Sequence, residues 1–375
     1  MELADSLDSG SSVLCGRAGS SPASRTKRQS KGCLFFVVIE VGFDIIKKNL
    51  GISASVCICA VEGTVKKQGI IYGMVVLIVA VMVGAAELFQ QNEIIFPEIT
   101  AIAVGALMAP KLAWRTNRIR ILALIMICAV LGIGTVLFVP GPTWVKITLA
   151  YGVAQAIFLL SGTSFAPMIS AIALPVLLGS ESIVYPVAAL LLTTLILGCH
   201  VALEKAGLKE SVEFIPVQAE KRDWQDAALR LALVAATSWI VLRLECRYVI
   251  APPLLVAFTE FSKRSSGARK MPVKVVAAIT LCGLAGAACR VVIHLSLDLP
   301  LTLAAVTATV LMILILTKLK AYVPPAGALC ILPMLIPAEK VMGYPLQILA
   351  GAALFMVLSL VLFHSEQRPL SEASR

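Results

Sequence analysis

From Gly69 onward, apolar runs separated by short polar loops follow one another to about residue 364. A helix needs about 20 mostly apolar residues to cross a hydrocarbon core of roughly 30 Å, and the runs are near that length or shorter. We read twelve runs, at about 70–90, 94–110, 119–139, 145–161, 164–180, 183–202, 226–246, 248–262, 274–295, 299–317, 323–337 and 345–364. The pattern predicts an all-α polytopic membrane protein with about twelve transmembrane or half-membrane helices.

The prolines of the first six runs recur in the last six. Segments 167–175 and 325–333 both begin and end in proline at a shift of 158 residues, and Tyr-Pro pairs at 185–186 and 344–345 match at 159. Further matches join Pro142 to Pro300 at 158 and Pro97 to Pro252 at 155. Because each half has an even number of crossings, both insert in the same orientation, so the sequence predicts two parallel six-helix repeats.

Composition supports the membrane class. The chain of 375 residues is 59% hydrophobic and 14% charged, with a mean hydropathy of +0.92, which is too little polar surface for a water-soluble globule. A net charge of +10 would suggest nucleic acid in a soluble protein, but here the Lys and Arg residues form short clusters between apolar runs. We therefore expect a lipid bilayer and no nucleic acid as partner.

Loop charge sets the expected orientation. The loops 111–120 and 263–274 are rich in Lys and Arg, which is typical of cytoplasmic loops. We expect a multi-pass protein of the cell inner (plasma) membrane with cytoplasmic N- and C-termini. Its expected parts are an extension (1–65), a first membrane repeat (66–203), a cytoplasmic linker (204–225), a second membrane repeat (226–365) and a cytoplasmic tail (366–375).

The extension reads differently from the rest of the chain. Its first 30 or so residues are rich in Ser, Gly, Arg and Lys and resemble the in-frame translation of a bacterial transfer-RNA gene. On that interpretation the extension is a gene-prediction artefact and initiation lies nearer Met74. The alternative is a disordered cytoplasmic tail.

Four short runs, 94–110, 164–180, 248–262 and 323–337, carry the candidate chemistry. Each has proline near its start, which favours helices that begin below the membrane surface with free backbone donors able to hold an anion. The candidate substrate pathway consists of Thr100, Thr163, Ser164, Pro167, Ser170, Thr259, Tyr322, Pro324, Pro325 and Gly327. The alternative is that these are short, tightly packed helices with proline caps.

Charged residues in the apolar runs give a second candidate site. Arg290 and His294 share one helix face near its outer end, and Arg243 is near them in the predicted topology, so the three form a candidate anion vestibule. Snorkelling of these side chains to the interface is the alternative. Glu98 follows Pro97, and we expect its carboxylate to cap its own helix; the alternative is a proton-binding role.

The residues 251–253, 323–328 and 344–345 resemble the HPP family of integral membrane proteins, whose signature is His-Pro-Pro before a Gly/Ala-rich apolar helix. The resemblance covers about 248–364 well and 94–202 more weakly, as two tandem copies. Val323 replaces the signature histidine, so no role of that histidine carries over. Some family members are implicated in nitrite movement across membranes, and the resemblance implies the same here.

Enzyme chemistry has little support. The three histidines are far apart, the ten cysteines are scattered, and no protease, hydrolase or nucleotide-binding motif is present. We therefore expect no enzyme, no catalytic residues, no cofactor and no metal. The expected function is a membrane transporter or channel for a small polar solute, an inorganic anion; the alternative is a non-transporting scaffold or sensor subunit. The sequence leaves a homo-oligomer open.

Overall fold

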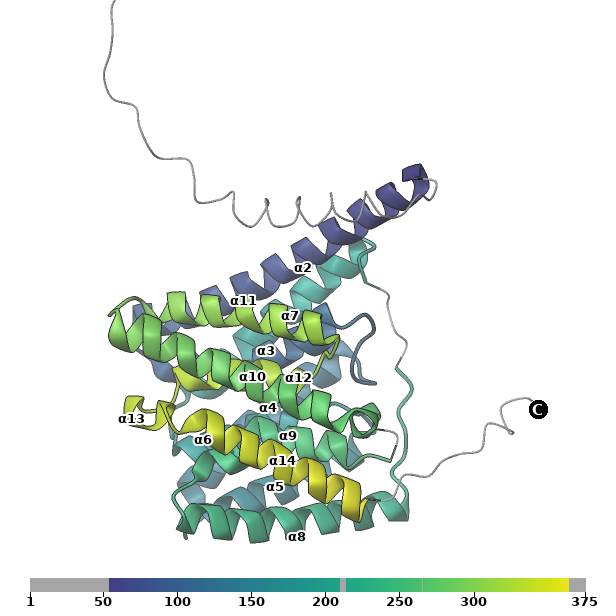
Figure 1. The fold of residues 1–375 in the computed structure, drawn as a ribbon. Coiled ribbons are helices and arrows are strands. Elements are labelled where there is room, and N and C mark those ends of the chain that lie inside the picture. Colours follow the sequence, from purple (N-terminus) through teal and green to yellow (C-terminus); the bar gives the residue numbers. More distant parts are fainter. Residues whose placement is uncertain (1–53, 210–213, 265, 364–375) are drawn as a thin grey trace, which may run out of the picture. The chain divides into compact units, whose positions relative to one another are not determined.

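A computed structural model describes residues 54–209, 214–264 and 266–363, with side chains from Lys67 onward. Every regular element of these residues is helical (Figure 1). The chain divides into Met1–Glu62 and Gly63–Arg375, and the latter is one compact unit. The predictions for the extension up to residue 53 and for the tail 366–375 lie outside the described residues.

Eight helices of the described residues are long and apolar enough to cross a membrane, by length and composition. This confirms the all-α fold class and indicates a multi-pass membrane protein. They are α2 (Ala54–Phe89, apolar from Lys67), α4 (Arg118–Phe138), α5 (Thr143–Leu160), α7 (Val184–Lys205), α8 (Lys221–Arg243), α10 (Pro272–Cys289) with its π-helical continuation η5 (Arg290–Ser296), α11 (Leu301–Leu319) and α14 (Tyr344–Leu362).

Four shorter helical segments lie among the long helices (Figure 1). They are α3 (Glu98–Ile102) continued by the π-helix η2 (Ala103–Met108), α6 (Met168–Leu178), α9 (Pro252–Phe261), and α12 (Pro324–Ile331) continued by η6 (Leu332–Met334). Nearly all their residues are buried, and proline opens each one, at the N-cap of α3 and α6 and at the first helical turn of α9 and α12. Proline fits there because the first-turn N–H groups have no intrahelical partner. Shorter elements are η1 (Asn92–Ile94), η3 (Arg247–Ile250), η4 (Gly267–Lys270) and α13 (Ala338–Val341).

The short helices pack in pairs that join the two halves of the chain. α3 packs against α12, α6 packs against α9, and α9 also contacts α12. Backbones come close where side chains are small: a Cβ at Gly327 would lie 2.8 Å from Thr100 O, and one at Gly132 would lie 2.6 Å from Ile172 O. Because lipid is as apolar as leucine, such close van der Waals packing stabilises a membrane bundle where the hydrophobic effect does not.

The chain does not turn back after α3 and η2. Phe96, before α3, stacks edge-on against Tyr185 at the start of α7, with 5.5 Å between ring centroids. Arg118, at the start of α4, forms an ion pair with Glu204 at the end of α7. Since α7 is about 33 Å long, the segment from Phe96 to Arg118 runs from one end of α7 to the other.

A similar tyrosine hydrogen bond occurs in each half of the chain. Tyr185 Oη donates to Ala171 O of α6 at 2.9 Å, and Tyr344 Oη donates to Leu329 O of α12 at 2.8 Å. Each tyrosine begins a long helix and is followed by proline. The bonds fix each long helix to the short helix before it.

The observed linker is shorter than the predicted one. α7 continues to Lys205, and α8 begins at Lys221, five residues before the predicted run at 226. A capping box explains this early start, because the side chains of Glu220 and Asp223 each accept from the other's backbone N–H. The first turn of α8 is charged, so an average of hydropathy does not show where the helix begins; its residues are Lys221, Arg222 and Asp223.

Candidate functional site

Buried polar side chains gather around the short helices in two groups. The Glu98 cluster contains Glu98, Thr100, Ser170 and Gly327 from α3, α6 and α12. The Arg230 cluster contains Tyr151, Gln155, Arg230, Thr259 and Ser262 from α5, α8 and the end of α9. Polar and ionisable groups inside an apolar bundle are costly, so such groups mark candidate functional sites.

Glu98 joins the first turns of two short helices. It is the first residue of α3 and is fully buried, with 0% exposure. Its Oε1 accepts a hydrogen bond from Ser170 Oγ near the start of α6, and its Oε2 has no hydrogen-bond partner among the described residues. The expectation that Glu98 caps its own helix missed this link to α6.

Thr100 and Gly327 close the space between α3 and α12. The Thr100 carbonyl lies where a side chain at position 327 would be, and Val104 Cγ2 is 3.0 Å from the same point. Thr100 Oγ1 is buried without a hydrogen-bond partner among the described residues. The backbones of α3 and α12 are therefore in close contact at this point, which makes Thr100 and Gly327 neighbours.

The Arg230 cluster is a connected hydrogen-bond network. Tyr151 Oη and Gln155 Nε2 each lie 2.9 Å from Thr259 Oγ1, which donates to Leu255 O. Ser262 Oγ donates to Thr259 O and accepts from Arg230 Nη1 at 3.1 Å. The network links three helices by side chains that are all buried.

Arg230 is a buried cation that contacts no carboxylate directly among the described residues, although Asp223 and Asp226 lie near enough to interact with its charge. It is 4% exposed, and it makes no ion pair with a carboxylate within the described residues. The nearby Asp226 pairs with Arg264 at 3.3 Å, and Arg230 Nε has no hydrogen-bond partner in the described part of the chain. A guanidinium stays charged in a protein and presents a planar fork of donors, so this group is suited to hold an anion.

A second basic side chain, that of Lys263, lies just beyond the C-terminal end of α9. Its Nζ donates to Ser164 O at 3.2 Å and lies 5.0 Å from the centre of the Phe158 ring. Ser164 also bonds to Arg115, since its Oγ accepts from Arg115 N at 2.8 Å. The predicted pathway residue Ser164 thus accepts from the Lys263 side chain and from the backbone N–H of Arg115. Lys263 also interacts electrostatically with Glu260.

Sequence reasoning missed Arg230. The residue was counted as part of the start of an apolar run, where a long basic side chain ordinarily reaches the interface. Its spacing from Ala227, Val234 and Val241 was the available signal, because these positions share one face of a helix and are all buried. An arginine on the apolar face of an amphipathic helix faces other helices.

The other predicted pathway residues serve local structure. Thr163 bonds to Ser161 Oγ in the loop before α6, Pro167 is the N-cap of α6, and Tyr322 lies beside Tyr72 of α2. Pro324 and Pro325 form the first turn of α12. Thr259 belongs to the Arg230 cluster, whereas Ser170, Thr100 and Gly327 belong to the Glu98 cluster.

The three predicted vestibule residues bond to different neighbours. Arg243 lies over the Trp239 ring at 5.3 Å, Arg290 Nη1 donates to Met334 O, and His294 Nδ1 is 2.9 Å from Leu299 O. A cavity of about 390 Å³ near the end of α8 is lined instead by Leu242, Glu245, Arg247 and Lys340.

Among the described residues, no group of three or more His, Cys, Asp and Glu side chains could hold a metal ion. Comparison of the chain with models of known families, with curated proteins and with solved structures gives no match.

Proposed function

We propose that the protein is a membrane transporter for a small polar solute, and that the solute is an inorganic anion. Arg230 carries the proposal, because a buried guanidinium that makes no ion pair among the described residues leaves room for a bound anion as counter-charge. Tyr151 and Gln155 are the uncharged donors of the same network that could turn toward a small oxyanion, and Ser262 positions the guanidinium by accepting from it. The resemblance to the HPP family is the ground for testing nitrite first.

The architecture proposed for this transporter is twelve membrane-crossing elements in two parallel repeats of six. The order long, short, long, long, short, long occurs twice among the described helices, which supports it. The paired Tyr185 and Tyr344 hydrogen bonds and the pairing of each first short helix with the other half's second short helix support it as well. Repeats of this kind place a binding site between them.

We propose the cell inner (plasma) membrane with both termini on the cytoplasmic side. Basic residues gather at one end of the bundle, where Arg118 pairs with the end of α7, and Lys263 meets the segment before α6. That concentration supports a cytoplasmic face.

The proposed pathway begins at this face. Lys263 and Ser164 draw an anion inward, Arg230 binds it, and the Glu98 cluster blocks the way beyond. Because the Thr100 carbonyl fills the space beside Gly327, passage requires α3 and α12 to separate. We therefore propose a carrier that opens and closes, in preference to a permanently open channel.

Uptake by proteoliposomes tests the proposal. The full chain should take up nitrite, nitrate or chloride faster than empty liposomes, and should not take up sodium. Arg230→Gln should abolish uptake, while Arg230→Lys should retain part of it because it keeps the charge but not the forked geometry. Lys221→Gln, on the exposed first turn of the same helix, is the matched control.

No uptake of any tested solute by folded protein would contradict transport and favour the alternative, a non-transporting scaffold. The close Thr100–Gly327 contact is the observation that favours that alternative. Anion uptake that is unaltered in folded Arg230→Gln protein would contradict the assigned role of Arg230.

A further inference from the structure

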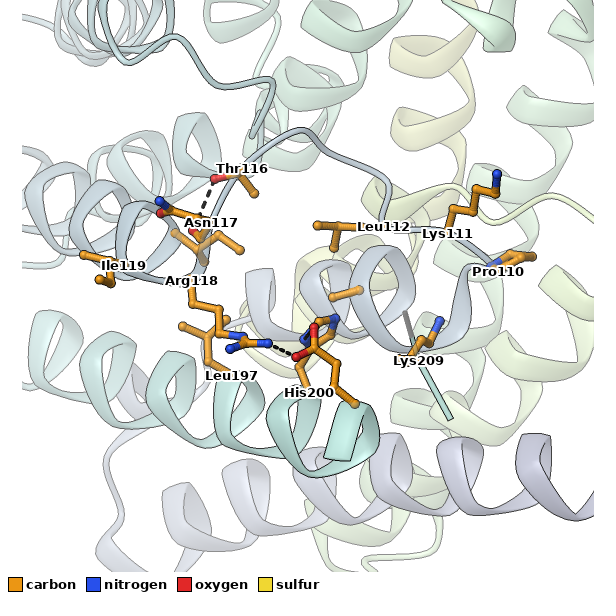
Figure 2. Close-up of a pocket in the computed structure, with 13 residues that line it drawn as sticks. Pro110, Lys111, Leu112, Thr116, Asn117, Arg118, Ile119, Leu197, His200 and Lys209 are labelled. Atoms are coloured by element: carbon orange, nitrogen blue, oxygen red, sulfur yellow. Dashed lines mark hydrogen bonds and ion pairs between the residues drawn. The ribbon is translucent and has the colours of Figure 1, made fainter. Parts of the chain in front are cut away.

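A separate cavity of about 680 Å³ opens at the basic end of the bundle (Figure 2). It lies between the loop that follows η2, the start of α4 and the end of α7. Its ionisable lining residues are Lys111, Arg118, His200, Glu204 and Lys209. None of these belongs to the Glu98 or Arg230 cluster.

The polar part of the lining is positively charged. Among the described residues, the lining holds Lys111, Arg118 and Lys209 and one carboxylate, that of Glu204, which pairs with Arg118. His200 Nδ1 lies 3.3 Å from the same carboxylate. Figure 2 shows Arg118 and His200 meeting on one side of the cavity, with Lys111 and Lys209 on the other. Lys209 Nζ donates to Ala109 O, so it is held at the rim and not free to swing away.

The first turn of α4 adds to this field. Asn117 is the N-cap, and its side chain accepts from Arg120 N. The helix dipole therefore directs its positive end into a cavity that already holds three cations.

The rest of the lining is apolar. Ile119 is 80% exposed, and Leu112, Ile121 and Leu197 line the same cavity. A small inorganic ion gains nothing from contact with apolar side chains. An amphiphile can place its charged group near the cations and its glycerol and first methylene groups against the apolar side chains. The cavity lies at the start of α4 and the end of α7, where an apolar helix of membrane-spanning length meets a charged loop. Such boundaries are where helices that cross a bilayer meet the lipid head groups.

We propose that this cavity binds a phosphate-bearing anionic amphiphile, namely the head group of an anionic phospholipid of the cytoplasmic leaflet. Lys111 and Lys209 contact the phosphate, Arg118 stays with Glu204, and the apolar wall takes the start of the acyl chains. Basic pockets between transmembrane helices bind such head groups by this chemistry. The binding requires no transport activity.

Native mass spectrometry of the full chain in detergent tests the proposal. The protein is mixed with phosphatidylglycerol, with phosphatidylcholine of the same chain length, or with inorganic phosphate. Phosphatidylglycerol should be retained well above phosphatidylcholine. The double variant Lys111→Gln/Lys209→Gln should bind it about 10-fold more weakly or worse, because each lysine near an anionic surface contributes attraction. Glu204→Gln, which removes the one carboxylate that the described residues contribute to the lining, should bind it more tightly.

The matched control is Lys205→Gln/Lys270→Gln. It removes the same net charge, both lysines are exposed, and neither lines the cavity. Equal losses in the two double variants would overturn the site in favour of general surface charge. Equal retention of phosphatidylcholine would overturn the charge recognition. Tight binding of inorganic phosphate without phosphatidylglycerol would overturn the lipid as the occupant. Circular dichroism of each variant establishes that it is folded.

Discussion

At Gly327 the side chain is missing because the carbonyl of Thr100 occupies its place. A Cβ there would be 2.8 Å from that oxygen. Gly327→Ala should therefore lower the free energy of unfolding by about 1–3 kcal/mol, since a packed core absorbs an extra methyl only by shifting backbone. Unfolding of the purified protein by dodecyl sulphate measures the loss. Gly198→Ala is the control, because position 198 of α7 has no atom within 4 Å of the added methyl. Equal stability of both variants would refute the close contact.

Lys209 sets a pH dependence for the lipid cavity. Burial lowers the pKa of its ammonium group, so it loses its charge at a lower pH than an exposed lysine does. The folded protein therefore releases this proton at a lower pH than the unfolded chain does. The free-energy cost of burying the charged lysine falls as the pH rises above the lowered pKa. Phosphatidylglycerol retention should fall over that alkaline range. The other charged groups lining the cavity are Lys111, Arg118, His200 and Glu204.

Lys209→Arg should move that fall to higher pH, because arginine stays protonated. Retention measured from neutral to alkaline pH in both proteins gives the comparison. Identical profiles would show that Lys209 does not carry the effect.

The sequence predicted some residues of the two buried clusters as site residues and not others. Ser170, Thr100 and Gly327 were selected because hydroxyls and glycine on proline-led short helices mark a pathway, and all three lie in the Glu98 cluster. Glu98 and Arg230 were passed over, because a charge near a helix end has an ordinary explanation in capping or snorkelling. Only the tertiary contacts with α6 and α9 distinguish them from that case.

A tyrosine at the start of α7 bonds to the short helix α6, and a tyrosine at the start of α14 bonds to the short helix α12. Tyr185→Phe and Tyr344→Phe each remove one buried hydrogen bond to a carbonyl and should each cost about 1 kcal/mol of unfolding free energy. If the two halves are equivalent, the two losses should agree closely. Unfolding by dodecyl sulphate measures both. Tyr248→Phe keeps its ring contact with Tyr344 and serves as the control.

The elements themselves were largely predictable. Hydropathy and proline placement predicted the four short helices to within a few residues, because proline at a first turn leaves a signal that packing does not alter. The start of α8 at Lys221 was not predicted, since its charged first turn hides the helix from a hydropathy average. The pairings of α3 with α12 and of α6 with α9 join distant parts of the chain, and no local pattern encodes them.

The orientation of the whole molecule can be tested by labelling. Cysteines introduced one at a time in a background without native cysteine should react from outside at Gln91 and Met342, and from the cytoplasmic side at Lys111 and Lys270. All four positions are exposed. A membrane-impermeant maleimide applied to right-side-out and inverted vesicles distinguishes the faces. Labelling of Gln91 and Lys111 from the same side would contradict a crossing by α3 and η2.

The pairing of α3 with α12 also determines when the protein can assemble during its synthesis. The ribosome makes α3 early and α12 near the end, so α3, with its buried glutamate, spends most of synthesis without the helix that covers it. α6 likewise awaits α9. The short helices of each half are buried by short helices of the other half, so neither half buries all of its core residues alone. A fragment ending at Lys205 should therefore be degraded when expressed alone and persist when a fragment beginning at Ala206 is co-expressed, as immunoblots of membranes would show. Assembly of this protein is then a single late event, and halting translation before α12 leaves nothing stable behind.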